Sequence, residues 1–217
     1  MVVACGPREM EYLKSRDKKL GEAIERIGPL SREGDPDLFA SVVHQIVGQQ
    51  ISTAAQATLW RRLGERLGTV DAPALLALGR EELQRVGMSF RKADYILDFA
   101  RRVEEGGFDL EALEGMPDRQ VVEALSSLKG VGAWTAEMIM TFSMGRPDVV
   151  SYGDLGILRG MRMLYRHRVM DREKFDKYRR RYSPCGTAAS LYLWEIARGA
   201  LPELTDPAPD KRSGDRI

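Results

Sequence analysis

One acidic side chain stands where it could act on a substrate. Asp154 follows a loop that contains glycine and proline (residues 145–153) and precedes a run with the apolar periodicity of a helix. An aspartate there caps the helix, and the N–H groups and dipole of a helix N-terminus favour its carboxylate form. A fixed carboxylate can stabilise a developing positive charge or activate water. Taken alone, however, an aspartate in this position is most often only a cap.

A second motif precedes this carboxylate. Residues 128–132 read Leu-Lys-Gly-Val-Gly and join two expected helices. Gly130 and Gly132 allow a tight turn and a close approach of a phosphate to the backbone, and Val131 can anchor the turn in the core. The N-terminus of the second helix then presents unpaired N–H groups to that phosphate. This pattern is typical of a helix-hairpin-helix, which contacts DNA backbone without reading sequence. A purely structural turn would carry the same residues.

The elements that must position these groups are helices. Helical periodicity dominates, strand signals are nearly absent, and candidate caps and stop glycines occur often. We therefore expect an all-α fold. The expected helices cover residues 8–27, 36–48, 52–67, 71–77, 80–86, 89–105, 117–126, 133–144, 155–166, 171–181 and 187–198.

Composition excludes several classes of protein. The chain has 217 residues, 43% hydrophobic and 30% charged, which is typical of a soluble globular protein. It contains no apolar run of the roughly 18 residues that a membrane span needs, and its N-terminus lacks signal-peptide features. Two cysteines, Cys5 and Cys185, are too few for a disulfide framework or a cysteine-ligated zinc or iron–sulfur site. We expect an intracellular protein, cytoplasmic and nucleoid-associated in a bacterium or nuclear in a eukaryote.

The basic residues are unevenly distributed although the net charge is only +1. Residues 159–181 contain ten Lys or Arg against three acidic residues. Such a stretch could face a polyanion. An ordinary solvated helix surface is the plainer interpretation.

Four ordered segments together resemble the helix-hairpin-helix (HhH-GPD) DNA glycosylase superfamily, and most closely its 3-methyladenine DNA glycosylase II branch. They cover roughly residues 36–198. The first is Phe39 to Ser52 with its Gly-Gln-Gln-Ile-Ser turn, and the second is Gly-Met-Ser-Phe-Arg-Lys-Ala-Asp-Tyr-Ile (87–96). The third is the hairpin followed by Asp154, and the fourth runs from Tyr182-Ser-Pro to Trp194.

The resemblance implies an enzyme that flips alkylated purines out of duplex DNA and hydrolyses their N-glycosidic bond. Asp154 would be the catalytic residue, because glycosidic cleavage passes through an oxocarbenium-like sugar. Trp134 and Trp194 would stack on the cationic base, which can leave without protonation. Met138 stands where close relatives carry a pocket tyrosine, and this substitution puts the substrate range in doubt. For both tryptophans, core packing is the alternative.

Trp134 also bears on the type of reaction. In bifunctional members of the superfamily a lysine at this position forms a Schiff base and cleaves the strand. This chain has tryptophan there, and Lys129 lies in the hairpin turn. The resemblance therefore implies a monofunctional glycosylase without lyase activity.

Further DNA contacts are implied by position. The Gln49-Gln50-Ile51 turn should fill the gap that a flipped base leaves, with Gln50 as the wedge, and Ser89 and Phe90 should probe the opposite strand. The hairpin contacts would come from Gly130, Val131, Gly132 and Thr135. No cofactor is expected, although the carbonyls of Ser126, Leu128 and Val131 could hold a monovalent cation.

Two helical subdomains should flank a cleft in this family. We expect an N-terminal helix (1–35) packed with the C-terminal helices, a subdomain (36–150) that includes the helix-hairpin-helix at about 117–144, a segment (151–204) with the catalytic aspartate and C-terminal helices, and a disordered tail (205–217). The expected partner is double-stranded DNA with alkylated bases, bound by a monomer away from any membrane. The alternatives are a non-catalytic DNA-binding module and a glycosylase for another damaged base.

Overall fold

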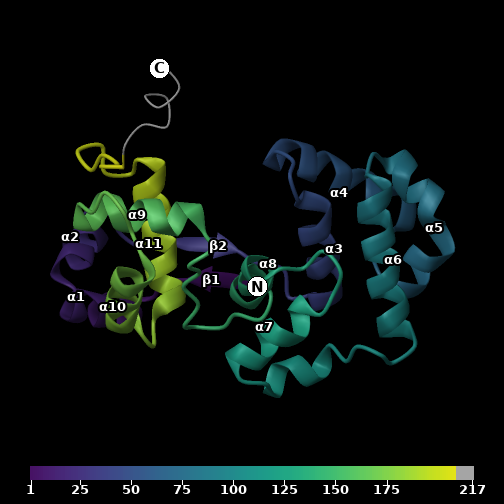
Figure 1. The fold of residues 1–217 in the computed structure, drawn as a ribbon, viewed down its shortest axis with the longest axis horizontal. Coiled ribbons are helices and arrows are strands. Elements are labelled where there is room, and N and C mark those ends of the chain that lie inside the picture. The colour runs from purple at the N-terminus through teal and green to yellow at the C-terminus, as the bar shows by residue number, and fades with distance from the viewer. Residues whose placement is uncertain (209–217) are drawn as a thin grey trace. The chain divides into compact units, whose positions relative to one another are not determined.

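The computed structural model describes residues 1–208, and the chain divides into two compact units (Figure 1). Unit 1 comprises Met1 and Gly34–Met144, and unit 2 comprises Val2–Glu33 and the chain from Gly145 onward. Each unit has its own set of helices. Among the described residues, no helix combines the length and the apolar character that crossing a bilayer requires.

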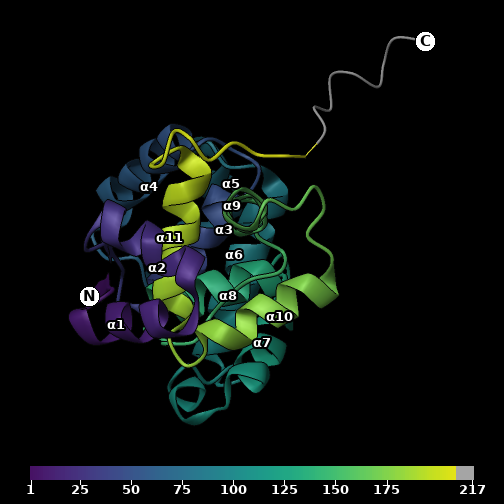
Figure 2. The same ribbon diagram turned by 90° about the vertical axis from the view of Figure 1, so that its left-hand side faces the viewer.

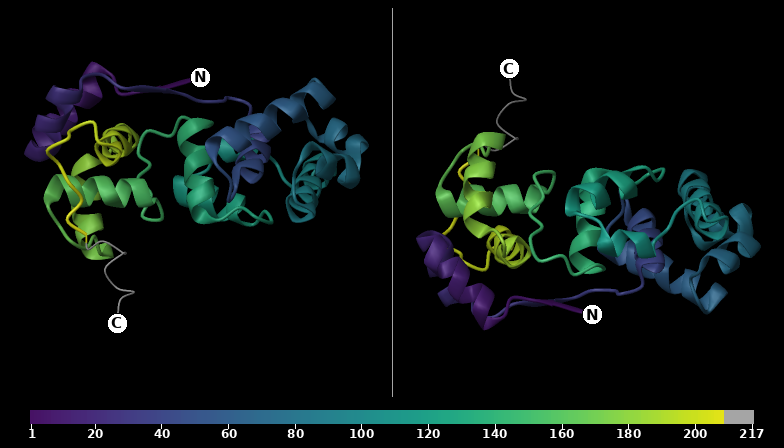
Figure 3. Two further views of the ribbon diagram at one scale, coloured as in Figure 1. Left: turned by 90° about the horizontal axis from the view of Figure 1, so that it is seen from above. Right: turned by 90° about the horizontal axis from the view of Figure 1, so that it is seen from below.

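Unit 1 is a set of helices in which α5 and α6 lie side by side (Figure 3). Hydrogen-bonding caps start four of these helices, because Asp37, Ser52, Asp71 and Ser89 each accept a backbone N–H from the first turn. The elements are α3 (Leu38–Gly48), α4 (Thr53–Leu67), α5 (Ala72–Val86), α6 (Phe90–Glu104), the 3-10 helix η1 (Glu111–Gly115), α7 (Asp118–Ser126) and α8 (Ala133–Phe142).

Unit 2 is built around its last helix, which contacts four others (Figure 2). That helix packs closely against α9, since a Cβ at Gly160 would lie 2.2 Å from the carbonyl oxygen of Leu193. Two short strands pair antiparallel, with Val3 opposite Arg32. The elements are β1 (Val2–Ala4), α1 (Pro7–Arg16), α2 (Lys18–Ile27), β2 (Ser31–Glu33), α9 (Leu155–Tyr165), α10 (Arg172–Tyr182) and α11 (Gly186–Arg198).

The predicted all-α class is confirmed, and the differences are local. The expected helix 8–27 is two helices, because Asp17 leaves helical geometry and caps α2 by accepting the Leu20 N–H at 3.0 Å. Arg181 binds the other carboxylate oxygen of Asp17 at 2.8 Å, and no local sequence signal could show that contact. Gly79 has φ +78° inside α5, at the break expected between 77 and 80. The two strands are only three residues each and were not expected.

Two expected boundaries differ from the structure. Residues 145–150, which we assigned to the first subdomain, belong to unit 2 because their backbone is hydrogen-bonded to α11. The expected disordered tail begins with an ordered contact, since both carboxylate oxygens of Asp206 accept hydrogen bonds from Arg162 at 2.9 and 2.6 Å. The remainder of that tail, residues 209–217, lies outside the described residues.

Candidate functional site

Asp154 is both a helix cap and a buried carboxylate in unit 2. Its backbone N–H closes a turn on the Ser151 carbonyl at 3.4 Å, and its Oδ1 accepts the Ile157 N–H at 2.8 Å. The side chain is 8% exposed. Because the N-terminus of α9 carries a partial positive charge, this position is electrostatically suited to an anion. The sequence-based interpretation as a cap is therefore compatible with a chemical role.

Trp194 contacts the same carboxylate from α11. Its indole Nε1–H donates to Oδ1 of Asp154 at 3.0 Å, so one oxygen accepts from two elements. Gly156 leaves room for this contact, since a Cβ there would lie 3.0 Å from Trp194 Cδ1 and 3.1 Å from Asp154 Oδ1, and one of the two side chains would have to shift slightly. Two residues predicted to share a pocket, Asp154 and Trp194, are thus brought together. The hydrogen bond between them had no sequence signal.

The hairpin of unit 1 joins α7 to α8, and its two glycines differ. Gly130 has φ +83°, and a Cβ there would lie 2.4 Å from the Tyr95 ring of α6. Gly132 has an ordinary φ of −95°, and a Cβ there would meet nothing within 4 Å. Tight turning therefore requires only Gly130, whereas Gly132 leaves the backbone at the start of α8 uncovered. Val131 is buried, as expected of an anchor.

The first turn of α8 carries the residues predicted to lie near a base or a phosphate. Trp134 is 44% exposed, whereas Met138, one turn later, is buried. The side chain of Thr135 is also buried, so its backbone N–H, at the third position of the helix, is the group that could meet a phosphate. Trp134 is thus a surface aromatic rather than a core residue.

The Gln49–Ile51 turn supports the hairpin in a way that we did not predict. Gln49 Nε2 donates to the Gly130 carbonyl at 2.6 Å, which ties the turn to the hairpin. Gln50 is exposed and has φ +57°, a conformation that non-glycine residues seldom adopt. Such strain is more common at functional positions than elsewhere. Ile51 is partly exposed beside it.

The residues at the start of α6 form several contacts within unit 1. Ser89 caps α6 by accepting the Lys92 N–H at 3.3 Å, which is the plain alternative to a DNA contact. Phe90 is 44% exposed, and the guanidinium of Arg80 lies 4.2 Å from its ring centroid. Lys92 Nζ donates to the Val47 carbonyl at 2.8 Å, and burial lowers the pKa of this lysine. Phe90, the first residue of α6, is the best placed of these residues for an external partner.

The turn residues also bear on the possible cation and on Lys129. Lys129 Nζ forms a 2.7 Å ion pair with Asp98 of α6. The Leu128 carbonyl already accepts the Val131 N–H at 3.1 Å, and Ser126 is the last residue of α7, where helix carbonyls lack partners within the helix. Within residues 1–208 no group of three or more His, Cys, Asp or Glu could hold a metal ion. A cation here would depend on backbone oxygens and stays a prediction.

The basic stretch 159–181 is largely engaged within unit 2. Six of its ten basic residues form ion pairs with acidic residues in the described part of the chain, which favours a structural role for these six. The pairs are Arg159 and Arg162 with Asp206, Arg172 with Asp176, Lys174 with Asp171, Arg179 with Asp148, and Arg181 with Asp17.

These features define a class of protein. One unit contains a glycine-containing helix-hairpin-helix with an exposed tryptophan at the start of its second helix. The other contains a buried carboxylate at a helix N-terminus, hydrogen-bonded to a second tryptophan. The class is a helical DNA-binding protein with a carboxylate suited to stabilising positive charge.

Known proteins share this architecture. Residues 43–184 match the model of the HhH-GPD superfamily of base excision DNA repair proteins. The chain is 28% identical to the putative DNA-3-methyladenine glycosylase YfjP of Bacillus subtilis, in a match that covers 74% of this chain and 59% of YfjP. It is 26% identical to DNA-3-methyladenine glycosylase 1 of Schizosaccharomyces pombe, in a match that covers 90% of this chain and 87% of that protein. The crystal structure of DNA-3-methyladenine glycosidase from Bacillus halodurans superposes with a TM-score of 0.81 at 36% identity, covering 91% of this chain and 92% of that one.

The chain therefore belongs to the HhH-GPD superfamily of base excision DNA repair proteins. The resemblance that the four motifs indicated is confirmed, and the relatives named above carry the name 3-methyladenine glycosylase or glycosidase. The chain spans less than two thirds of YfjP but most of the other two proteins.

Proposed function

We propose that this chain is a monofunctional DNA glycosylase that hydrolyses the N-glycosidic bond of alkylated purines in duplex DNA. The observation that carries the proposal is the Asp154 carboxylate, buried, capping α9 and bound by the Trp194 indole. An anion held in this way can stabilise the oxocarbenium-like sugar, because its position costs no reorganisation when charge develops. Similarity to glycosylases named for 3-methyladenine supports the choice of substrate.

The other groups have defined parts in this proposal. The hairpin backbone around Gly132 binds a phosphate, and Gln50 fills the space that the flipped nucleotide leaves. Trp134 and Trp194 contact the cationic base, with Met138 one turn from Trp134. A base that already carries positive charge leaves as a neutral molecule, so no general acid is needed. DNA containing such bases is the proposed partner, and the protein acts as a monomer.

Two residue types support the proposal that the enzyme has no lyase activity. Trp134 has no amine with which to form a Schiff base, and the Lys129 amine is paired with Asp98. The product should be an abasic site in an intact strand. A protein–DNA adduct trapped by borohydride would contradict this part of the proposal.

The decisive experiment separates the charge of Asp154 from its capping role. Asparagine caps a helix about as well as aspartate. Asp154→Asn should therefore fold normally but release methylated bases at least about 100-fold more slowly, the scale on which a single electrostatic contact to a transition state is felt. Released bases are identified by chromatography after incubation with methylated duplex DNA.

A matched control is Asp71→Asn, which alters another aspartate cap, one that accepts the Ala74 N–H at 2.9 Å in unit 1. This variant should keep wild-type activity. Equal base release by Asp154→Asn and wild type would reduce Asp154 to a cap. DNA binding without base release by the wild type would instead favour a non-catalytic DNA-binding module, and release of only other damaged bases would redefine the substrate.

A further inference from the structure

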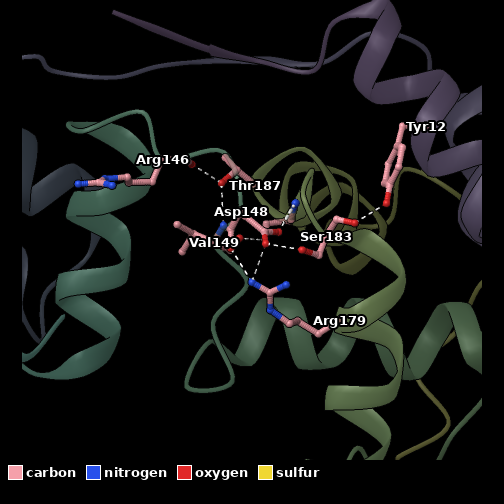
Figure 4. Close-up of polar contacts among 9 residues, drawn as sticks. Tyr12, Arg146, Asp148, Val149, Arg179, Ser183 and Thr187 are labelled. Atoms are coloured by element: carbon pink, nitrogen blue, oxygen red, sulfur yellow. Dashed lines mark hydrogen bonds and ion pairs between the residues drawn. The ribbon is translucent and has the colours of Figure 1, made fainter. Parts of the chain in front are cut away.

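The segment that leads to Asp154 is held along α11 by side-chain hydroxyls (Figure 4). Thr187 Oγ1 donates to the Arg146 carbonyl at 2.6 Å and accepts the Val149 N–H at 3.0 Å. Ser190 Oγ donates to the Val149 carbonyl at 2.9 Å. Thr187 is 6% exposed and Ser190 is 1% exposed, so these bonds form away from water. The backbone of residues 146–149 is thus hydrogen-bonded to side chains along one face of α11.

Asp148 adds a second attachment at the start of the same helix (Figure 4). Its Oδ1 accepts the Gly186 N–H at 2.9 Å, and its Oδ2 accepts the Ser183 hydroxyl at 2.6 Å. Arg179 of α10 donates to the Asp148 carbonyl at 2.8 Å and pairs with its carboxylate at 3.1 Å. The backbone of the segment is therefore fixed on both sides of Asp148.

The spacing along α11 relates these contacts to the candidate catalytic carboxylate. Thr187, Ser190 and Trp194 occupy positions i, i+3 and i+7, which lie on one face of a helix. The first two bind the backbone of residues 146–149, and the third binds Asp154 Oδ1 at 3.0 Å. One helix face thus contacts both the approach to the carboxylate and the carboxylate itself.

Apolar residues could fill the buried positions 187 and 190 equally well, so the hydroxyls of Thr187 and Ser190 must have a role other than packing. With valine at 187, the Val149 N–H would lose its partner, and an unpaired buried donor costs about 1–3 kcal/mol. These bonds also set the register, since a shift of the segment by one residue would break all of them. The hydroxyls therefore fix the position of residues 146–149 on α11, which the burial of apolar side chains alone would not do.

We propose that this polar face of α11 positions Asp154, with Thr187 and Ser190 as positioning residues for the reaction. The inference rests on the proposed glycosylase activity of Asp154. Reacting groups must be held closely, because a displacement of about 1 Å can cost about 100-fold in rate. Loosening residues 146–149 moves the start of α9, and with it the carboxylate, relative to the Trp194 indole.

The test compares Thr187→Val, which keeps the shape of the side chain but loses its hydroxyl, with Thr187→Ser, which keeps the hydroxyl. Thr187→Val should release methylated bases about tenfold more slowly in single turnovers at saturating DNA. Its affinity for DNA should be unchanged, since among the described residues the hydroxyl bonds to the segment 146–149. Thr187→Ser should lie within about twofold of wild type.

Ser151→Ala is a matched control in the same segment. Ser151 is fully buried, and among the described residues its hydroxyl has no hydrogen-bond partner. Removing this hydroxyl should leave the rate unchanged. If Thr187→Val does not fold, Ser190→Ala, which removes one of the hydroxyl contacts, takes its place in the comparison.

A readout independent of activity is the ¹H–¹⁵N resonance of the Trp194 indole. The chain has three tryptophans, so the three indole signals are assigned by single Trp→Phe variants. In Thr187→Val the Trp194 signal should shift and exchange faster with solvent, and the same change is expected in Asp154→Asn. A Trp194 signal identical to wild type, or equally slow Thr187→Ser and Thr187→Val enzymes, would overturn the proposal. If the wild type releases no methylated base, the proposed function fails, and the indole signal still decides whether α11 positions Asp154.

Discussion

The two units differ in the exposure of the polar and aromatic groups that we propose to be functional. Unit 2 buries the carboxylates of Asp17 and Asp154, half-buries that of Asp148, and gives each of the three at least two donors. Unit 1 exposes the groups proposed to meet DNA, among them Gln50 and Trp134. Chemistry needs a charge that does not move, whereas contact with a nucleic acid needs groups that a partner can reach. Variants in unit 2 should therefore alter the chemical step and variants in unit 1 the binding step.

The same contrast exists on a smaller scale within the hairpin. Gly130 is required by the fold, because its φ is positive and Tyr95 fills the space beside it. Gly132 satisfies neither condition; it is the N-cap of α8, and its lack of a side chain leaves the backbone there open to a partner. Two glycines in one short motif thus have different physical reasons.

The largest expected effect comes from Gly130→Ala. An alanine at positive φ costs about 1–2 kcal/mol, and overlap with Tyr95 adds about 1–3 kcal/mol. Unfolding in urea should show a loss of about 2–5 kcal/mol, with DNA binding weakened as well. Gly132→Ala is the control: it alters only the N-cap of α8, so it should lose no more than about 1 kcal/mol, yet bind duplex DNA more weakly. Equal stability of the two variants would remove the distinction between the glycines.

A smaller effect is expected for Trp194→Phe, which keeps an aromatic ring but removes the donor to Asp154. Base release should slow about tenfold, equivalent to about 1.4 kcal/mol, the size of a hydrogen bond to a charged group. DNA affinity should stay at the wild-type value, as measured by fluorescence anisotropy. Loss of affinity without loss of rate would place Trp194 in the binding step and break the division between units.

Gln50 tests the other side of this division. Gln50→Gly removes the wedge side chain and relieves about 1–2 kcal/mol of strain at the positive φ, while glycine adds unfolded-chain entropy worth about 0.4–1 kcal/mol, so thermal unfolding should show a small net gain in stability. Base release from duplex DNA should fall, while release from a mismatched, easily flipped nucleotide should fall less. Gln50→Ala, which lacks the relief of strain, is the matched variant. Unchanged activity of both variants would show that the wedge lies elsewhere.

The smallest effect concerns pH. Burial lowers the pKa of His44, and the same cause lowers the pKa of His167. Because the pKa of these histidines is lower in the folded chain than in the unfolded chain, the unfolded chain binds protons at a higher pH than the folded chain does. The stabilisation is therefore complete above the ordinary histidine pKa of about 6.5 and is lost as pH falls through and below it. The decline in melting temperature from pH 7 to pH 5 should be shallower in His44→Gln, and an unchanged slope would exclude His44 as a cause.

Local signals in the sequence were sufficient for most of the helices and for the chemistry-bearing motifs. Caps such as Ser52 and Asp71, the break at Gly79 and the cap at Asp154 all depend on residues within one or two turns of each other. Since capping and backbone preference are local effects, the sequence alone determined the all-α class, the hairpin and the candidate carboxylate. The order of the motifs determined the family.

Only the tertiary structure decided which groups those motifs contact. The Asp17–Arg181 ion pair that accompanies the break between α1 and α2 joins residues 164 positions apart, and Thr187 meets Arg146 41 positions away. The same holds for Trp194 with Asp154 and for Gln49 with Gly130. A hydroxyl or an indole N–H takes whichever partner the packing of helices presents, and that packing depends on the whole apolar core. The types of these residues can be read from the sequence, but their hydrogen-bond partners are set only when the chain folds.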